Sequence, residues 1–259
     1  MSEMPELRYE LHREIEDRHW WFLARRKIIL DRLSFYLPRN KGLTVVEVGC
    51  GTGGNLAQLR KYYRAIGTEI SPRAANIARR KTGCPVFLGD RLDVMGNMTQ
   101  EVDGILLLDL LEHLRDPVRF LKQINRSLTD RVTLLVTVPA GQWFFSEHDL
   151  AFGHIKRYNR RLLEQELRKA GFKIIYISRF NTILYLPALI VRLTRKAIMP
   201  FRRGKQYKTD FWIPPQILNN ALAAAMGLER FLLRKISLPF GLSIVAIAKK
   251  TAIPPSHPF

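Results

Sequence analysis

The chain has 259 residues, 47% of them hydrophobic and 25% charged, so it can bury a sizeable core and is not expected to be disordered. Two cysteines and the lack of an uncharged apolar run of about 20 residues argue against a disulfide scaffold and a membrane-spanning helix. The net charge of +19 favours an anionic partner, such as nucleic acid, phospholipid headgroups or a phosphorylated substrate.

The first predicted element is a helix over residues 5–37. Leu7, Ile15 and Leu33 belong to a set of apolar residues that recur at roughly helical spacing, and Pro38 ends the pattern. Acidic residues stand where a secretory leader would need an apolar core. We therefore expect no such leader and a cytoplasmic location.

A regular alternation of short apolar runs and amphipathic segments follows this helix. The apolar runs predict strands at residues 43–48, 64–70, 85–89, 104–110, 131–138, 172–180 and 243–250. The amphipathic segments predict helices near residues 54–63, 72–82, 116–128 and 160–171. Because strands and helices alternate, we expect an α/β fold with a mostly parallel seven-stranded sheet, helices on both faces, and ligands at the carboxyl ends of the strands.

Residues 181–239 form a predicted helical insertion between the last two strands, with helices near 182–199 and 215–235. Residues 179–235 hold eleven Lys and Arg residues and two acidic ones, which is nearly half of the chain's excess positive charge. The insertion is therefore the part of the chain where an anionic partner is most expected.

The first helix of the insertion predicts a contact with an anionic membrane surface through residues 181–210. Ile183, Leu186 and Ile190 can share one face of this helix, and the basic side chains that follow lie toward the other. A basic amphipathic helix is typical of proteins that lie in the interface of anionic lipid. Packing of these apolar residues in the core, with a solvated charged face, is the alternative.

The segment VVEVGCGTGGN runs from a predicted strand into glycines. Glycines allow a ligand to approach the backbone closely, and the N–H groups at the start of the next helix suit an anionic or polar group. Gly49, Gly51 and Gly54 fit the dinucleotide pattern G-x-G-x-x-G, and Glu69 falls where a ribose-binding acid belongs. This loop alone leaves a nicotinamide-dependent dehydrogenase open.

Three further features separate the alternatives. Glu47 precedes Gly49 by two residues, so that the loop also reads E-x-G-x-G-x-G through Gly53. Asp90 ends the third strand, and LLDLLEHLRDP follows the fourth. Together these features resemble the class I S-adenosylmethionine-dependent methyltransferases, in particular bacterial members of the type 11 and type 23 groups. The resemblance implies a Rossmann-like fold.

The resemblance also implies a domain organisation. Residues 1–40 would form an N-terminal helical cap, which lies across the cofactor cleft as a lid in similar methyltransferases. Residues 41–180 and 240–250 would form the domain that binds S-adenosyl-L-methionine, and 181–239 would be the basic amphipathic insertion.

Ten residues are assigned to the cofactor by this resemblance, all near the ends of the first four strands: Glu47, Gly49, Gly51, Gly53, Glu69, Ile70, Asp90, Asp109, Leu110 and His113. The glycine loop would hold the methionine portion, Glu69 would accept hydrogen bonds from the ribose hydroxyls, and Asp90 would face the adenine amino group. A helix-capping role is the alternative for Asp90, and a local hydrogen bond is the alternative for His113.

The loop VPAGQWFFSEHDLAFGHIKRY leaves the fifth strand where such a fold places the methyl acceptor. His148 or His154 could act as general base, because a neutral imidazole titrates near working pH, and Asp149 or Glu147 could orient it. The alternative is that both histidines hold the loop closed. The residues predicted to contact the acceptor are Trp21, Arg25, Trp143, Arg157 and Tyr158.

Trp21 and Arg25 come from the segment RHWWFLARR in the first helix. With Trp20 and Arg26 they would wall the acceptor pocket if this helix covers the cofactor cleft. An aromatic stripe that only docks the helix is the alternative interpretation.

The sequence thus predicts an S-adenosylmethionine-dependent methyltransferase, without a metal site, acting on the oxygen (or nitrogen) of a small, amphiphilic or lipid-linked acceptor near the inner face of the membrane. An RNA methyltransferase, a dehydrogenase and a non-catalytic scaffold are the alternatives. DLLEHL differs from the Asn/Asp-Pro-Pro-aromatic element of enzymes that methylate base amino groups, and no Pro-Cys nucleophile is present. Oxygen or guanine methylation of RNA stays open.

Overall fold

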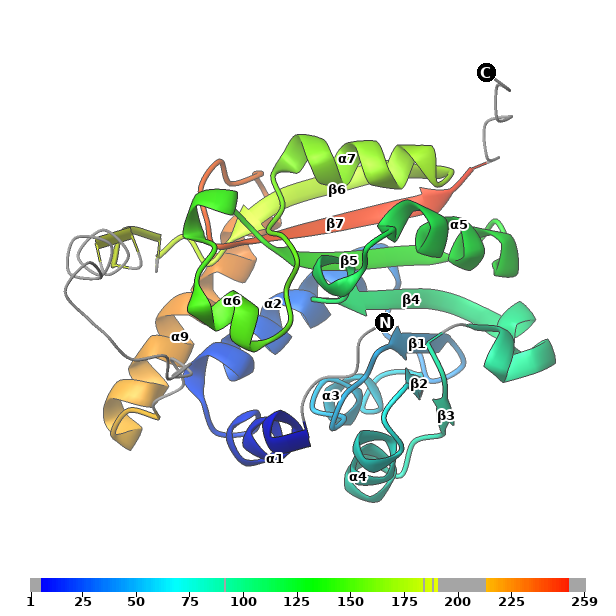
Figure 1. The fold of residues 1–259 in the computed structure, drawn as a ribbon, viewed down its shortest axis with the longest axis horizontal. Coiled ribbons are helices and arrows are strands. Elements are labelled where there is room, and N and C mark those ends of the chain that lie inside the picture. The colour runs from blue at the N-terminus through cyan, green and yellow to red at the C-terminus, as the bar shows by residue number, and fades with distance from the viewer. Residues whose placement is uncertain (1–5, 91, 184, 188, 191–212, 252–259) are drawn as a thin grey trace.

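The computed structural model describes residues 6–90, 92–183, 185–187, 189–190 and 213–251 (Figure 1). In this part of the chain seven strands form one sheet in the order β3-β2-β1-β4-β5-β7-β6. The strands are β1 (Thr44–Val48), β2 (Arg64–Glu69), β3 (Val86–Leu88), β4 (Val102–Leu108), β5 (Thr133–Pro139), β6 (Phe172–Phe180) and β7 (Ser243–Lys250). Only β7 is antiparallel to its neighbours, β5 and β6, so the predicted mostly parallel sheet is confirmed.

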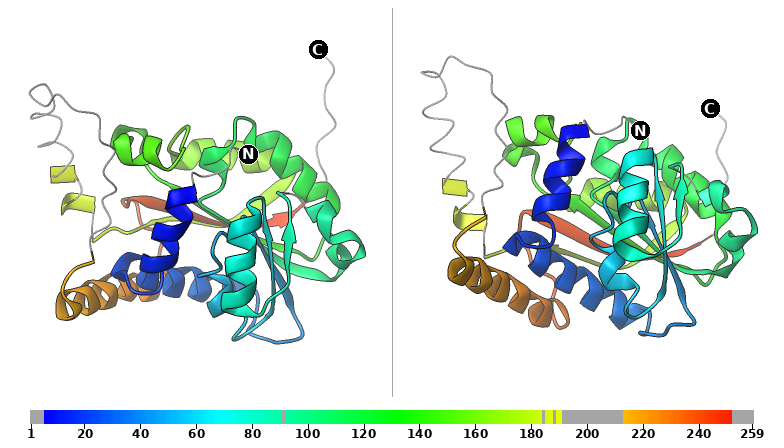
Figure 2. Two further views of the ribbon diagram at one scale, coloured as in Figure 1. Left: turned by 60° about the horizontal axis from the view of Figure 1, so that its bottom comes forward. Right: turned by 90° about the horizontal axis from the view of Figure 1, so that it is seen from below.

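The helices cover both faces of this sheet (Figures 1 and 2). The α-helices described are α1 (Glu6–Ile15), α2 (Trp20–Tyr36), α3 (Leu56–Leu59), α4 (Pro72–Thr82), α5 (Pro117–Ser127), α6 (Glu147–Ala151), α7 (Arg160–Lys169) and α9 (Gln216–Leu233). Three 3₁₀ segments join them: η1 (Leu92–Glu101), η2 (Leu111–His113) and η3 (Gln142–Phe144).

The alternation of side chains along each strand divides the core into two layers. Ile105 and Leu107 of β4 pack toward α5, α7 and η1, whereas Leu106 packs toward α2, α3, α4 and α9. A strand in the middle of a parallel sheet is buried on both faces, which explains why β4 and β5 read as continuous apolar runs in the sequence.

The predicted single helix over residues 5–37 is wrong, because the structure breaks it between Ile15 and Trp20. His19 is the N-cap of α2, and its ring nitrogen accepts a hydrogen bond from the backbone N–H of Trp21. The break turns α1 away from α2, so that α1 lies toward α3 and α4 (Figures 1 and 2).

The predicted helix near 215–235 is present as α9, which packs along α2. Asn219 joins the two helices: its side chain accepts from the backbone N–H of Trp20 at 2.9 Å and donates to the carbonyl of Arg18 at 2.8 Å. At the other end, the fully buried Arg32 donates to the carbonyl of Leu233 at 2.7 Å. Most of the predicted helix near 182–199, and residues 191–210 of the predicted membrane contact, lie outside the described residues.

The described residues include no helix that is both long and apolar enough to cross a bilayer.

Candidate active site

The glycine loop between β1 and α3 borders open space at Gly51. This residue has φ of +55°, and a side chain there would meet nothing within 4 Å. At Gly49 and Gly53 an added Cβ would instead lie 2.9 Å from Leu110 and 3.0 Å from Ala78, respectively. Gly49 and Gly53 therefore serve close packing, and Gly51 is the loop position where a ligand can approach.

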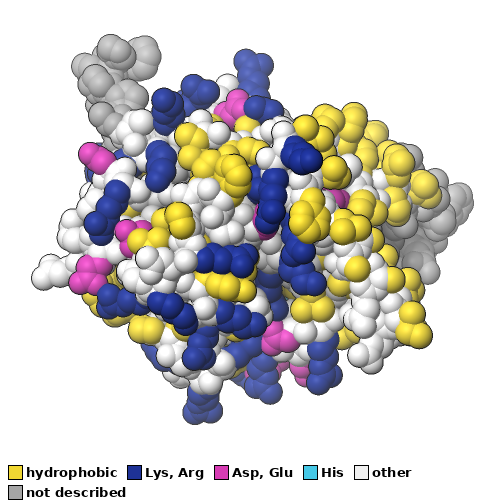
Figure 3. All heavy atoms as spheres, turned by 180° about the vertical axis from the view of Figure 1, so that it is seen from behind, with side chains coloured by type: hydrophobic (Ala, Val, Ile, Leu, Met, Phe, Trp, Pro, Cys, Tyr) yellow, Lys and Arg dark blue, Asp and Glu magenta, His cyan; other side chains and the backbone are white. Residues whose placement is uncertain are grey.

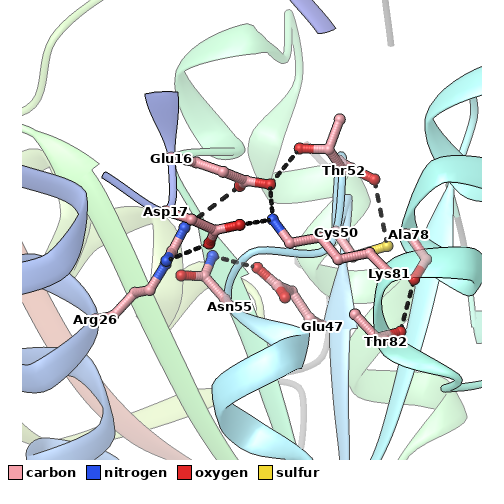
Figure 4. A network of polar contacts seen from close by, with 11 residues as sticks. Glu16, Asp17, Arg26, Glu47, Cys50, Thr52, Asn55, Ala78, Lys81 and Thr82 are labelled. Atoms are coloured by element: carbon pink, nitrogen blue, oxygen red, sulfur yellow. Dashed lines mark hydrogen bonds and ion pairs between the residues drawn. The ribbon is translucent and has the colours of Figure 1, made fainter. Parts of the chain in front are cut away.

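Glu47 lies at the end of β1 with its carboxyl group directed at this loop (Figure 4). Its Oε1 accepts a hydrogen bond from Asn55 Nδ2 at 2.7 Å, but its buried Oε2 has no partner among the described residues. Burial raises the pKa of Glu47 to about 8, against the opposing effects of Asn55 and Arg25. An unpaired buried oxygen of this kind suits a cationic ligand group such as an ammonium.

Glu69 ends β2 beside the same loop. Its carboxylate accepts hydrogen bonds from the backbone N–H groups of Gly51 at 2.8 Å and Ser71 at 3.0 Å. Ile70 follows at once and is partly buried, and Asp90, also partly buried, follows the end of β3. Since β2 pairs with β3 through Glu69 and Leu88, the three predicted residues emerge at one edge of the sheet.

Helix α1 and the turn after it cover the glycine loop through polar contacts (Figure 4). Tyr9 Oη lies 3.5 Å from a carboxylate oxygen of Glu69. Glu16 accepts hydrogen bonds from Thr52 of the loop at 2.7 Å and from Lys81 of α4 at 2.6 Å. No sequence motif marks this network, because Glu16 in the turn after α1 and Lys81 on α4 stand among many other charged residues.

Asp109 and Arg25 meet at the end of β4. Arg25 is 5% exposed, and one of its terminal nitrogens lies 2.7 Å from Asp109 Oδ2 and 2.7 Å from Thr137 Oγ1. Asp109 has a positive φ of 52°, which is costly for a residue with a side chain and is often found at functional sites. The structure thus brings two predicted residues, one from α2 and one that follows β4, into direct contact.

His12 of α1 was not predicted as a site residue, yet it lies among side chains that surround the candidate site. Its ring packs edge-to-face against Phe22 at 5.4 Å and lies 5.6 Å from the ring of Phe152. Burial lowers the pKa of His12 below its usual range, and Glu16 and Arg25 act on it in opposite directions. No motif marks this residue in the sequence, and only the break between α1 and α2 places it here.

Asp149 organises the loop after β5. The residue is fully buried, and it accepts hydrogen bonds from His154 Nδ1 at 2.9 Å and from Arg157 Nε at 2.8 Å. Burial alone would raise the pKa of Asp149, but these two partners outweigh it and hold the pKa well below its usual range. With Nδ1 donating to a carboxylate, the lone pair of His154 is on Nε2.

The Nε2 atom of His154 faces residues of η2. It lies 4.0 Å from Glu112 Oε1, and its ring centre lies 4.9 Å from that of His113. His113 Nδ1 in turn lies 3.2 Å from the carbonyl oxygen of Gly153. His113 thus makes the local hydrogen bond that was the alternative to a cofactor contact, and this bond joins the end of β4 to the acceptor loop.

The other residues predicted for the acceptor differ in their surroundings. Tyr158 has no exposed surface, and its hydroxyl donates to Glu166 at 2.9 Å, so the structure gives it a packing role. Trp143 is 62% exposed on η3, and Trp21 is partly buried with the Arg25 guanidinium 5.3 Å from its ring centre. His148 belongs to α6, but its side chain, like that of Glu147, lies outside the described residues.

A family model described as a methyltransferase domain matches residues 20–177, which is more than half of the chain. This match extends from α2 to β6 and contains the glycine loop, the end of β4 and the acceptor loop.

The chain belongs to the methyltransferase domain family.

Two curated relatives are 26% identical to this chain. One is a probable S-adenosylmethionine-dependent methyltransferase of Mycolicibacterium smegmatis, aligned over 62% of this chain and 62% of its own. The other is an O-methyltransferase of Penicillium expansum, aligned over 59% of this chain and 61% of its own. The match thus spans less than two thirds of either relative.

The fold also matches solved structures. A SAM-dependent methyltransferase of Archaeoglobus fulgidus has a TM-score of 0.52 and 18% identity, and the match covers 87% of this chain and 94% of that one. This likeness confirms the predicted Rossmann-like methyltransferase fold.

The residues of this site fit S-adenosylmethionine, the cofactor named for the probable methyltransferase of Mycolicibacterium smegmatis. Gly51 borders open space, and Glu47 Oε2 is an acceptor without a partner among the described residues, which suits the ammonium of the methionine portion. The carboxylate of Glu69 stands at the neighbouring strand end, where the resemblance places the ribose.

Proposed function

We propose that this methyltransferase transfers the methyl group of S-adenosylmethionine to an oxygen or nitrogen atom of a small or amphiphilic acceptor. The observation that carries this proposal is the end of β1, where an unpaired buried oxygen of Glu47 adjoins the open space at Gly51. Family membership and the O-methyltransferase relative support the reaction type.

When bound, the cofactor supplies an electrophilic methyl group on a sulfonium sulfur. The chain then has to bind both reactants in line and exclude water. Asp109 stands at the end of β4 beside the glycine loop, and its negative charge, partly offset by Arg25, is compatible with a neighbouring sulfonium. Helix α1 covers the loop and restricts the entry of water.

The acceptor side of the site is formed by the start of α2 and the loop after β5. Phe22 and Phe152 flank His12 there, and the Arg25 guanidinium lies over Trp21. These aromatic rings would pack on an apolar portion of the acceptor. His154 of this loop is held in place through Asp149, and its Nε2 faces η2 on this side of the site.

We further propose that the acceptor is reached at an anionic membrane surface. Exposed apolar side chains gather at the end of the molecule that carries α9, with Lys and Arg side chains on the adjoining face (Figure 3). They are Ile183, Leu186, Ile190, Ile217, Leu218, Leu228, Phe231, Leu232, Ile236 and Phe240. An apolar surface next to basic side chains is complementary to anionic lipid.

The proposal is tested by incubating the protein with methyl-labelled S-adenosylmethionine and separated lipid, small-molecule and RNA fractions of bacterial cells. We expect label in the lipid or small-molecule fraction, and at least tenfold less with Glu47→Gln. Label confined to the RNA fraction would make the chain an RNA methyltransferase and contradict the proposed acceptor class.

A further inference from the structure

A compact group of metal-binding side chains lies where η2 meets the loop after β5. Glu112, His113 and His154 each offer one ligand atom, and these three atoms all lie within 4.8 Å of one another. Two of the residues follow β4 directly, and the third comes from about forty positions further along the chain. The fold, and not the sequence spacing, brings them together.

Glu112 gives independent evidence that this group binds a cation. The residue is fully buried, and neither of its carboxyl oxygens has a hydrogen-bond partner among the described residues. A buried carboxyl group without partners is costly whether it is ionised or protonated, and native proteins rarely retain one without a role. A cation between Glu112 and the two histidines would supply the missing partner.

The two imidazole rings are already held as metal ligands usually are. Nδ1 of His154 bonds to the buried carboxylate of Asp149, and Nδ1 of His113 lies 3.2 Å from the carbonyl of Gly153. When Nδ1 donates to an oxygen, the lone pair is on Nε2. Metal-ligating histidines almost always have such an oxygen partner on the nitrogen that does not bind the metal.

We propose that Glu112, His113 and His154 bind one divalent transition-metal ion of the zinc, cobalt or manganese type. Two imidazoles and one carboxylate suit these ions, whereas Mg²⁺ and Ca²⁺ prefer sites made of oxygen ligands only. Ligand atoms at about 2.1 Å from a tetrahedral ion lie roughly 3.4 Å apart, so the three side chains draw together by about 1 Å on binding. The ion retains at least one open coordination position.

The role of this ion in the reaction rests on the proposed function. The ion lowers the pKa of an acceptor hydroxyl next to it, and the hydroxyl proton passes to water. The acceptor oxygen then bonds to the methyl carbon, while the carbon–sulfur bond breaks with its electron pair going to sulfur. Since the ion uses the lone pair of His154 Nε2, this imidazole serves as a ligand and not as the general base.

Metal binding is tested on the full chain, without an affinity tag, by titration with ZnCl₂ and with CoCl₂. We expect one ion per chain and visible Co²⁺ absorption bands in the wild type. Glu112→Gln, His113→Ala and His154→Ala are each expected to weaken Zn²⁺ binding at least tenfold and to change the Co²⁺ spectrum. The matched control is His19→Asn, because His19 lies outside the cluster and Asn retains the capping function; its affinity should equal that of the wild type.

Thermal unfolding separates a metal ligand from a merely structural residue. Glu112→Gln removes an unpaired buried acid, so without metal the variant should melt at a temperature no lower than that of the wild type. Zn²⁺ should raise the melting temperature of the wild type but not that of the variant. The inference is overturned if the wild type shows no saturable binding, or if the three substitutions leave the Zn²⁺ affinity unchanged. Binding of S-adenosylhomocysteine is measured on the same samples. If the wild type binds S-adenosylhomocysteine but no metal ion, this inference alone is refuted. If the wild type does not bind S-adenosylhomocysteine, the proposed function is refuted.

Discussion

Glu47 is the residue whose ionisation we propose to be coupled to binding of the cofactor. Burial raises its pKa to about 8, so near pH 7 the carboxyl group is mostly protonated. Arg25 and Arg26 favour its ionised form, whereas Glu16 disfavours it. A bound ammonium next to Glu47 Oε2 would favour ionisation further, so that binding releases a proton.

The affinity for S-adenosylhomocysteine is therefore expected to depend on pH. The ionised form of Glu47 is the one that binds, so the affinity should rise with pH up to about 8, by as much as tenfold per pH unit, and level off above it. Glu47→Gln should weaken binding and remove this rise. Calorimetry in buffers of different ionisation enthalpy measures both the affinity and the proton release. A pH-independent wild-type affinity between pH 6 and 8 would show that Glu47 does not face the cofactor.

Arg25 and Asp109 form a second testable pair. Arg25 is 6% exposed in its side chain and Asp109 is 29% exposed, so solvent screens the pair only in part. Arg25→Met should lower the free energy of unfolding by about 2 kcal/mol, because Asp109 loses its ion-pair partner and keeps only the Thr137 hydroxyl as a side-chain donor, and Thr137 loses the donor to its Oγ1. Asp109→Asn added to Arg25→Met should recover part of the loss. Urea denaturation measures both; equal stability of wild type and Arg25→Met would contradict a structural contribution of this pair.

At the scale of elements, the strands could be predicted from the sequence, but the division of the N-terminal helix into α1 and α2 could not. Apolar runs such as those of β4 and β5 reveal buried strands, and Glu47, Glu69 and Asp109 follow from their positions at strand ends. The break between α1 and α2 leaves no signal, because helical periodicity continues across it. The contact of His154 with Glu112 depends on how the loop after β5 folds back, which spacing does not encode.

The position of α1 over the glycine loop predicts that this helix acts as a lid for the cofactor. Glu16→Gln weakens the contacts with Lys81 and Thr52, and should speed the dissociation of S-adenosylhomocysteine about fivefold. Amide exchange in α1 should also rise. Stopped-flow displacement and hydrogen–deuterium exchange measure these effects. The matched control is Glu14→Gln, an exposed residue in the last turn of α1, two positions before Glu16; equal rates in both variants would show that α1 is not a lid.

At the scale of the whole molecule, the cofactor site and the exposed apolar surface are separate features of one fold. The proposed site lies at the carboxyl ends of β1, β2 and β4, and the surface includes exposed apolar side chains of α9 together with Ile183, Leu186 and Ile190. The sequence predicted a membrane contact through residues 181–210, and this stays a prediction. The exposed apolar residues of α9 extend it to the second helix of the insertion.

Vesicle binding tests this surface. We expect the protein to sediment with vesicles containing phosphatidylglycerol but far less with neutral phosphatidylcholine vesicles, and added salt should weaken binding. Ile217→Asp, at a side chain that is 87% exposed, should reduce binding at least threefold. Val94→Asp, which is 38% exposed on η1, is the control for an added charge elsewhere. Equal loss in both variants, or no binding to anionic vesicles, would contradict membrane docking through α9.

The central claim is that the loop after β1 binds S-adenosylmethionine and not a nicotinamide dinucleotide, which its glycine spacing alone would also allow. The most direct measurement is isothermal titration calorimetry of the full chain with S-adenosylhomocysteine and with NAD⁺. We predict saturable binding of one S-adenosylhomocysteine per chain, weakened by Glu47→Gln, and no detectable heat with NAD⁺. Binding of NAD⁺ without a response to S-adenosylhomocysteine would contradict the account.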